Sequence, residues 1–138
     1  MTPFVVDASI TLAWFFLDEA TPYSAAVRAR LRHTRAVAPA IWLFEVANAV
    51  VLARRRRRLT DAQADRVLRL LTVLPVDVEL KTLTDIVGAV SSLAIREQLT
   101  VYDASYVDAA IRLGVPLATL DARMRAVAER LGGPLAEP

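Results

Sequence analysis

Four acidic residues that lie far apart in the chain have the types and positions needed to bind a divalent metal ion: Asp7, Glu45, Asp103 and Asp121. Asp7 and Asp121 each follow directly on an apolar run that is typical of a buried strand. The carboxyl ends of parallel strands form the ligand-binding edge of an open α/β sheet, so both side chains are expected there. Glu45 and Asp103 lie in strongly apolar segments, where a buried carboxylate needs a compensating partner or metal.

A set of carboxylates of this kind suits Mg²⁺ or Mn²⁺, because these hard ions prefer oxygen ligands. Two carboxylates about 5 Å apart repel by roughly 3 kcal/mol at an effective dielectric near 20, so at least one acid is expected to have a raised pKa without metal. A bound cation activates water for attack on a phosphodiester and stabilises the transition state. The sequence has no cysteine and only one histidine, His33, so any metal must be held mainly by oxygen.

Three polar residues are placed to support these acids. Asn48 follows Glu45 by three positions, so a helix puts its amide beside the carboxylate. Thr119 lies two positions before the last acid at a strand end, so both side chains point the same way. Ser9 lies two positions after Asp7, where it either contacts a substrate phosphate or metal-bound water, or caps the following helix.

Each acid taken alone has a simpler interpretation. Asp7 and Asp121 occupy positions where aspartate often caps a helix or stabilises a turn. Asp103 can be a first-turn acid favoured by the helix dipole. Asp108 lies about 140° around the same helix, which predicts a surface residue, with an additional acid of the site as the alternative. Glu45 and Asp103 resist the capping or turn explanation better than the other two acids do.

The segments between these residues alternate between strand and helix with no linker or repeat, which predicts one α/β domain over residues 1–138. Strands are predicted at residues 4–6, 35–38, 75–78 and 116–120, with a short fifth strand at 134–136. Helices are predicted at residues 9–17, 22–31, 41–58, 60–74, 83–98, 100–113 and 121–131. Right-handed crossovers then give one parallel sheet with helices on both faces.

Local signals mark the ends of several helices. Ser9 is a candidate N-cap, and Pro22 suits a first helical turn. Thr60, followed three positions later by Gln63, indicates a capped start. Gly114 is expected to close its helix as a C-terminal cap.

Composition limits the class of protein. Hydrophobic residues make up 55% and charged residues 23%, which excludes a disordered chain. The net charge is +2, and setting the four acids aside leaves eleven acidic against seventeen basic residues, a balance of +6. A basic surface around an acidic pocket suits a polyanionic substrate. Uncharged stretches are too short to span a bilayer and Asp7 interrupts any signal-peptide core, so we expect a cytoplasmic protein without a membrane segment.

The four acids lie in segments that resemble the four motifs of PIN-domain ribonucleases, specifically the VapC-type toxins of bacterial toxin–antitoxin pairs. The resembling segments are Val-Val-Asp-Ala-Ser at residues 5–9, residues 39–48 with Trp42, Glu45 and Asn48, Leu-Thr-Val-Tyr-Asp-Ala-Ser-Tyr at residues 99–106, and Leu-Ala-Thr-Leu-Asp at residues 117–121. One such segment is weak evidence, but four in the right order over almost the full length are a specific match.

The resemblance implies a PIN-like three-layer α/β/α sandwich with a five-stranded parallel sheet, and an Mg²⁺- or Mn²⁺-dependent endoribonuclease that hydrolyses phosphodiester bonds in cellular RNA. It also implies frequent homodimerisation and inhibition by a small cognate VapB-type antitoxin. The catalytic, metal-binding role carries over to Asp7, Glu45, Asp103 and Asp121, and a supporting role to Ser9, Asn48 and Thr119. The RNA target does not carry over, because related toxins cut different RNAs.

Two further features have open interpretations. The five consecutive arginines at residues 54–58 either form a solvated helix end or contact RNA phosphates or an acidic antitoxin segment. The segment 41–53 is apolar nearly all round, which predicts burial against a second subunit as well as the sheet. Four aromatic residues are assigned to the core or a dimer interface rather than to base stacking: Trp14, Phe15, Phe16 and Trp42.

Two other functions compete with the ribonuclease. One is a catalytically inactive PIN-like binding or regulatory module, against which the intact acidic set argues. The other is a phosphoryl-accepting signalling domain, which also gathers aspartates at strand ends. That class needs a lysine near the fourth or fifth strand, and Lys81 lies far from both segments.

Overall fold

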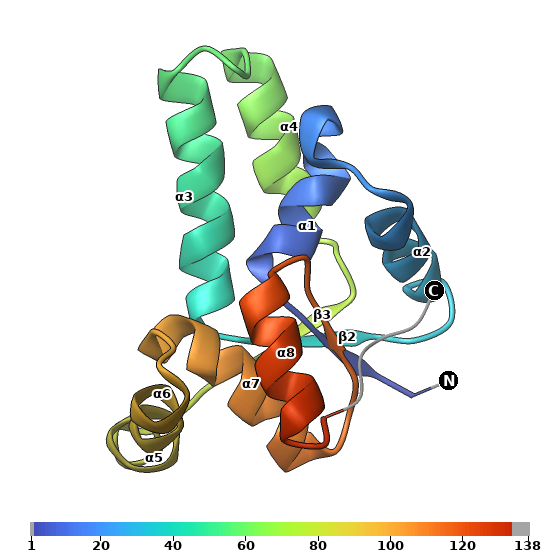
Figure 1. Ribbon diagram of the computed structural model, residues 1–138. Helices are drawn as coiled ribbons and strands as arrows, with labels where there is room; N and C mark the ends of the chain where they lie inside the picture. Colours follow the sequence, from blue (N-terminus) through green and yellow to red (C-terminus); the bar gives the residue numbers. More distant parts are fainter. Residues whose placement is uncertain (1, 134–138) are drawn as a thin grey trace.

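A computed structural model describes residues 2–133 of the chain (Figure 1). In chain order its elements are β1 (Phe4–Val6), α1 (Ala8–Phe15), the 3₁₀ turn η1 (Leu17–Glu19), α2 (Pro22–Arg30), β2 (Ala36–Pro39), α3 (Ile41–Arg55), α4 (Asp61–Leu71), β3 (Val76–Glu79), α5 (Leu83–Asp85), the π-helical turn η2 (Ile86–Val90), α6 (Ser91–Glu97), α7 (Val101–Leu113), β4 (Leu117–Ala118) and α8 (Ala122–Arg130). The predicted fifth strand at residues 134–136 lies outside the described residues.

The strands form one parallel sheet in the order β3-β2-β1-β4. The sheet has four strands within residues 2–133, where five were predicted. β1 is fully buried and pairs on both sides, with Phe4 opposite Ala36 of β2 and Val5 opposite Leu117 of β4. Its short apolar sequence suits such a central strand, which has no solvent face. The end of β1, and with it Asp7, therefore lies inside the carboxyl edge of the sheet.

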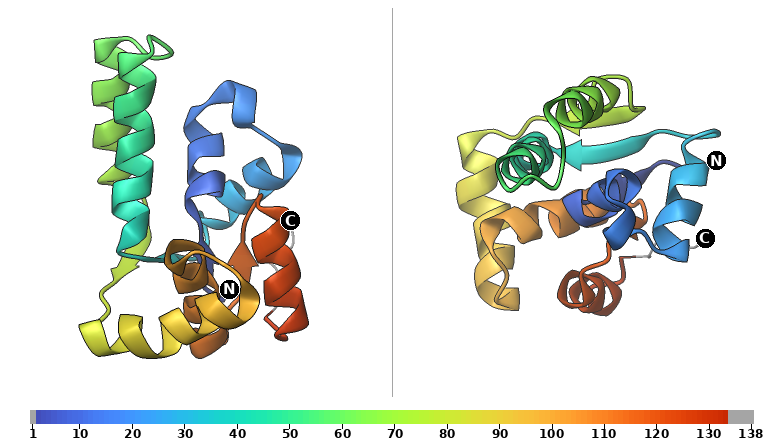
Figure 2. Two further views of the ribbon diagram at one scale, coloured as in Figure 1. Left: turned by 60° about the vertical axis from the view of Figure 1, so that its left-hand side comes forward. Right: turned by 90° about the horizontal axis from the view of Figure 1, so that it is seen from above.

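The main core lies between the sheet and α7, which contacts β1, β2 and β4. Tyr106, Val107 and Ala110 of α7 are at most 1% exposed. A smaller cluster of Val50, Ala64 and Val67 joins α3 to α4. These two helices form a hairpin that projects beyond the sheet (Figures 1 and 2). α7 is thus held rigidly on the sheet at the same edge where β1 ends.

The four aromatic residues assigned to the core pack there. Phe16 and Trp42 are 6% and 3% exposed. Trp14 packs against the main core and Phe15 against the α3–α4 cluster. Their prediction as core residues is confirmed.

Several predicted helix ends are confirmed. Pro22 occupies the first turn of α2, and Gly114 closes α7 in the left-handed conformation, at φ 64°. At α4 the Thr60 hydroxyl accepts a hydrogen bond from the Gln63 N–H, and the Gln63 side chain accepts one from the Thr60 N–H. This reciprocal pair satisfies two backbone donors that a helix start leaves free.

Two predictions about helices are wrong. α1 begins at Ala8 and is capped by Asp7, so Ser9 lies inside the helix and is not its N-cap. The single helix predicted over residues 83–98 is divided, because η2 interrupts it between α5 and α6. There the Ser91 hydroxyl donates to the carbonyl of Ile86, five positions earlier, at 2.6 Å.

None of the described helices combines the length and the apolar character that a membrane crossing requires.

Candidate metal centre

Asp7 is the most enclosed acid at the carboxyl edge of the sheet, with 4% of its surface exposed. Its Oδ1 accepts hydrogen bonds from the Ser9 hydroxyl at 2.6 Å and the Ile10 N–H at 3.1 Å, and its Oδ2 accepts one from the Thr119 hydroxyl at 2.5 Å. Burial raises the pKa of Asp7 to about 6, although these three donors lower it, and repulsion by Glu45 adds to the rise. The carboxylate is therefore fixed in orientation but costly to ionise.

Thr119 and Ser9 join the end of β1 to the end of β4. The Thr119 hydroxyl, which donates to Asp7, accepts a hydrogen bond from the Asp121 N–H at 3.0 Å. The Ser9 hydroxyl accepts one from the Leu120 N–H at 3.0 Å. Both side chains were predicted to support the acids, and both contact Asp7 directly.

Asp121 is the N-cap of α8 and lies three positions after Ala118, the last residue of β4. Its Oδ1 accepts hydrogen bonds from the N–H groups of Arg123 and Met124, at 2.9 and 3.0 Å, so it caps the helix. Its Oδ2 has no hydrogen bond among the described residues. The capping interpretation and the metal-binding interpretation are thus compatible, because each uses a different oxygen.

Glu45 reaches the site from the second turn of α3, which starts directly after β2. The Trp42 indole N–H donates to the Thr11 hydroxyl at 2.9 Å and so fixes α3 against α1. The Glu45 carboxylate accepts a hydrogen bond from the Tyr106 hydroxyl at 2.8 Å. Burial raises the pKa of Glu45, the Tyr106 hydrogen bond lowers it, and repulsion by Asp103 raises it further. α3 thus brings a half-buried carboxylate to the sheet edge.

Asp103 lies in the first turn of α7, where its N–H donates to the capping hydroxyl of Thr100 at 3.0 Å. Burial is the main cause that raises its pKa, followed by repulsion from Asp121, while Arg123 lowers it. Its predicted position in a first helical turn is confirmed. Its carboxylate still faces another acid, which a helix-dipole role does not explain.

The four carboxylates form a continuous electrostatic series across the edge of the sheet. Glu45 acts on Asp7, Asp103 acts on Glu45, and Asp121 acts on Asp103, each raising the pKa of its neighbour. Within residues 2–133, however, no three acidic or histidine side chains come close enough together to hold a metal ion. The donor set is all oxygen and its members repel one another, which fits a hard cation.

Asn48 lies in α3 with Glu45, as predicted, but its supporting role stays a prediction. It is exposed, and no hydrogen bond joins its amide to the Glu45 carboxylate in the part of the chain that the structure describes. Three positions along α3 put the two residues on neighbouring rows of the helix, which is not sufficient for a contact between their side chains.

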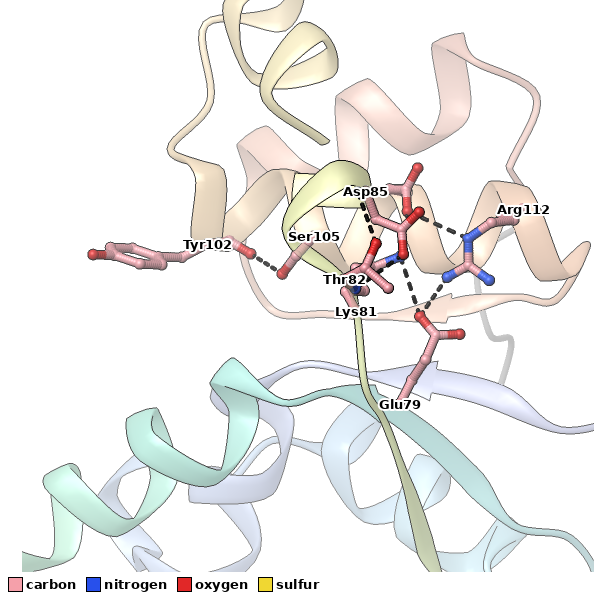
Figure 3. A network of polar contacts seen from close by, with 8 residues as sticks. Glu79, Lys81, Thr82, Asp85, Tyr102, Ser105 and Arg112 are labelled. Carbon is pink, nitrogen blue, oxygen red and sulfur yellow. Dashed lines mark hydrogen bonds and ion pairs between the residues drawn. The ribbon is translucent and has the colours of Figure 1, made fainter. Parts of the chain in front are cut away.

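An ion-pair network around the mostly buried Lys81 was not predicted (Figure 3). The Lys81 ammonium, with its side chain only 8% exposed, lies 2.8 Å from Asp108 and 3.3 Å from Glu79. Arg112 pairs with Glu79 and lies 3.5 Å from Asp108. The prediction that Asp108 is a surface residue is wrong, because Lys81 and Arg112 enclose it. The network ties β3 to α7, the helix that carries Asp103.

The five arginines at the end of α3 are exposed. Arg54 pairs with Asp61 at 2.8 Å, and Arg58 pairs with Asp18 at 3.0 Å and lies 4.8 Å from the Phe16 ring centre. Arg54 thus joins the two helices of the hairpin, and Arg58 ties the hairpin to η1. The arginines between them are presented to solvent at the end of the helix.

A family model of the PIN domain matches residues 4–130, and the chain therefore belongs to the PIN-domain family. Two solved structures are similar over nearly the whole chain. PAE2754 from Pyrobaculum aerophilum has 26% sequence identity and a TM-score of 0.73, covering 97% of this chain and 88% of its own. VapC20 from Mycobacterium tuberculosis, described as a sarcin-ricin loop cleaving toxin, has 17% identity and a TM-score of 0.68, covering 99% and 100%. No curated protein is similar enough to count as a match.

Proposed function

We propose that this chain is an Mg²⁺- or Mn²⁺-dependent endoribonuclease that hydrolyses phosphodiester bonds in cellular RNA and acts in the cytoplasm as the toxin of a toxin–antitoxin pair. Membership of the PIN-domain family supports a nuclease, and the fold shared with VapC20 supports the toxin class. The observation that carries the proposal is Asp7, a buried carboxylate held by three donors beside a second acid.

The proposed ligands of the cation are Asp7, Glu45, Asp103 and Asp121. A bound Mg²⁺ or Mn²⁺ supplies an activated water as nucleophile and stabilises the charge that develops on the phosphate. The protein contributes the orientation of the oxygens: Ser9 and Thr119 fix the plane of the Asp7 carboxylate, and the backbone of α8 fixes that of Asp121. Such supporting hydrogen bonds orient ligands and tune their basicity.

The test is cleavage of labelled single-stranded RNA by the purified protein. We expect cleavage with Mg²⁺ or Mn²⁺, none with EDTA, and a loss on the order of 100-fold or more in Asp7→Asn. The matched control is Asp65→Asn, which changes an exposed aspartate of α4 and should leave the rate unchanged. An active Asp7→Asn protein would contradict the proposal. Binding of metal and RNA without any cleavage would favour the inactive binding module instead.

The proposal includes a homodimer. The first turns of α3 leave Leu43 and Phe44 48% and 71% exposed, on the helix predicted to face a second subunit. Beside them is an apolar hollow of about 300 Å³, lined by residues that include Ile41, Ile86 and Val101. Sedimentation of the full chain should give twice the monomer mass, and Phe44→Glu should shift it to the monomer. An antitoxin would be identified as a small protein that co-purifies with the chain and abolishes cleavage.

A further inference from the structure

The Tyr106 hydroxyl makes the only side-chain hydrogen bond that Glu45 receives within the described residues. Tyr106 is 1% exposed and projects from α7, so its ring is fixed by the core and its hydroxyl position is set by the packing of that helix on the sheet. Phenylalanine would fill the same space. A buried hydroxyl is costly without partners, so its presence here needs a reason.

The hydroxyl lies between the first two acids of the site. It donates to Oε1 of Glu45 at 2.8 Å, and the negative charge of Asp7 also acts on it. Burial and the negative charges of Glu45 and Asp7 raise the pKa of Tyr106 far above its usual value, so the phenol keeps its proton and remains a donor. The hydrogen bond that this hydroxyl donates is thus directed at an acid of the site.

Among the described residues, only one of the two carboxylate oxygens of Glu45 accepts a hydrogen bond. Oε1 is held by Tyr106, while Oε2 has no hydrogen bond in the described part of the chain. A glutamate on a helix surface has three side-chain torsions and samples several rotamers, so a fixed donor on one oxygen selects the orientation of the other. Glu45 is half-buried and approaches from α3, whereas Asp7 is already immobilised at the end of β1. Glu45 is therefore the acid that most needs such a constraint.

We propose that Tyr106 is a positioning residue that holds one oxygen of Glu45 so that the other is presented, beside Asp7, to a hard divalent cation. The inference rests on the proposed function, because it assumes that these acids bind metal. It assigns to Tyr106 no contact with RNA or with the reacting atoms. Hydrogen bonds of this kind to a ligand typically change metal affinity by about 10–100-fold.

The experiment is calorimetric titration of Mn²⁺ into the metal-free full chain, as wild type, Tyr106→Phe and Tyr102→Phe. Tyr102→Phe is the matched control, because it removes the same hydroxyl from the same helix at a residue that is 58% exposed. For Tyr106→Phe we expect a Kd about tenfold higher with unchanged stoichiometry. For the control we expect the wild-type Kd. Circular dichroism should show that both variants are folded.

Two further measurements separate positioning from a structural role. With RNA as substrate, Tyr106→Phe should need about ten times more Mn²⁺ for half-maximal cleavage while its rate at saturating Mn²⁺ stays within about threefold of wild type. Glu45→Asp shortens the side chain that reaches the hydroxyl, so adding Tyr106→Phe to it should change the Kd by less than about twofold. A fall in stoichiometry, or additive losses in the double variant, would overturn the positioning role.

Different results would contradict the proposed function and the proposed role of Tyr106. A wild-type protein that takes up no Mn²⁺ contradicts the proposed function. A wild-type protein that binds Mn²⁺ and cleaves RNA, beside a Tyr106→Phe variant with the same Kd, overturns only the role of Tyr106.

Discussion

Asp7→Asn is expected to stabilise the metal-free protein at neutral pH while it abolishes activity. Asp7 is buried, and its pKa is raised from 3.8 to about 6. The folded protein therefore holds the Asp7 proton more tightly than the unfolded chain does. The stabilising contribution of the protonated form is fully present below pH 3.8 and is lost as the pH rises through 6. Asparagine occupies almost the same volume and does not titrate.

The size of the change in unfolding free energy follows from the difference between the pKa of Asp7 in the unfolded chain and in the folded protein. A rise from 3.8 to about 6 corresponds to about 3 kcal/mol of unfolding free energy lost between pH 3.8 and pH 7.5. The amide of asparagine cannot accept the Thr119 proton at the position of Oδ2, which costs about 1–2 kcal/mol at every pH. Asp7→Asn should thus be less stable than wild type near pH 4 and about 1–2 kcal/mol more stable at pH 7.5.

Urea unfolding at several pH values between 4 and 7.5, with EDTA present, measures this directly. The free-energy curves of wild type and Asp7→Asn should cross, whereas Asp65→Asn should run parallel to wild type. Saturating Mn²⁺ should stabilise wild type more than Asp7→Asn, because the cation compensates the buried charge. Parallel curves for Asp7→Asn and wild type over the whole range would refute the assignment of a costly buried carboxylate.

Three other predictions, the first with a control substitution, test the supporting structure. Lys81→Met should cost about 2–3 kcal/mol in urea unfolding, because it leaves two partly buried acids with fewer partners. Arg35→Ala breaks an exposed ion pair and should cost much less than Lys81→Met. Thr119→Val removes a donor that lowers the pKa of Asp7, so the acid limb of the pH–rate profile should move to higher pH; an unchanged limb contradicts this. Trp42→Phe loses a buried hydrogen bond and should lower unfolding free energy by about 1–2 kcal/mol, as thermal melts will show.

Local signals in the sequence predicted the ends of several helices and strands. Thr60 and Gln63 marked the start of α4, and Gly114 marked the end of α7, because caps and left-handed turns depend on residues close in the chain. The apolar runs before Asp7 and Asp121 predicted strand ends for the same reason. The edge of the sheet that bears the candidate site was therefore predictable.

Contacts between distant segments were not predictable from helical spacing. Asp108 was assigned to the surface from its angle on the helix, but Lys81, 27 positions earlier, returns from β3 to enclose it. Tyr106 was given no role of its own from the sequence, and its hydrogen bond to Glu45 spans 61 positions. The periodicity of one helix shows which of its faces is apolar, but it does not show which other segment packs against that face. The one signal in the sequence that could have indicated a polar role for Tyr106 was its hydroxyl group within a strongly apolar segment.

The role of Ser9 shows how one residue type can mislead. Serine is a good N-cap, yet Asp7 two positions earlier takes that role because its Oδ1 reaches the Ile10 N–H.

The helix predicted over residues 83–98 is divided at η2, which contains Gly88. Glycine has a low helix propensity and does little to enforce regular α-helical hydrogen bonding.

Enclosure of Lys81 also determines how this protein can be labelled. It is the sole lysine of the chain, and its ammonium is shielded by Asp108 and Glu79. Succinimidyl dyes, biotin esters and amine-directed crosslinkers will react there slowly, and such reagents are a poor choice for trapping a bound RNA or protein. Reagents directed at guanidinium or carboxyl groups have many more accessible targets on this surface.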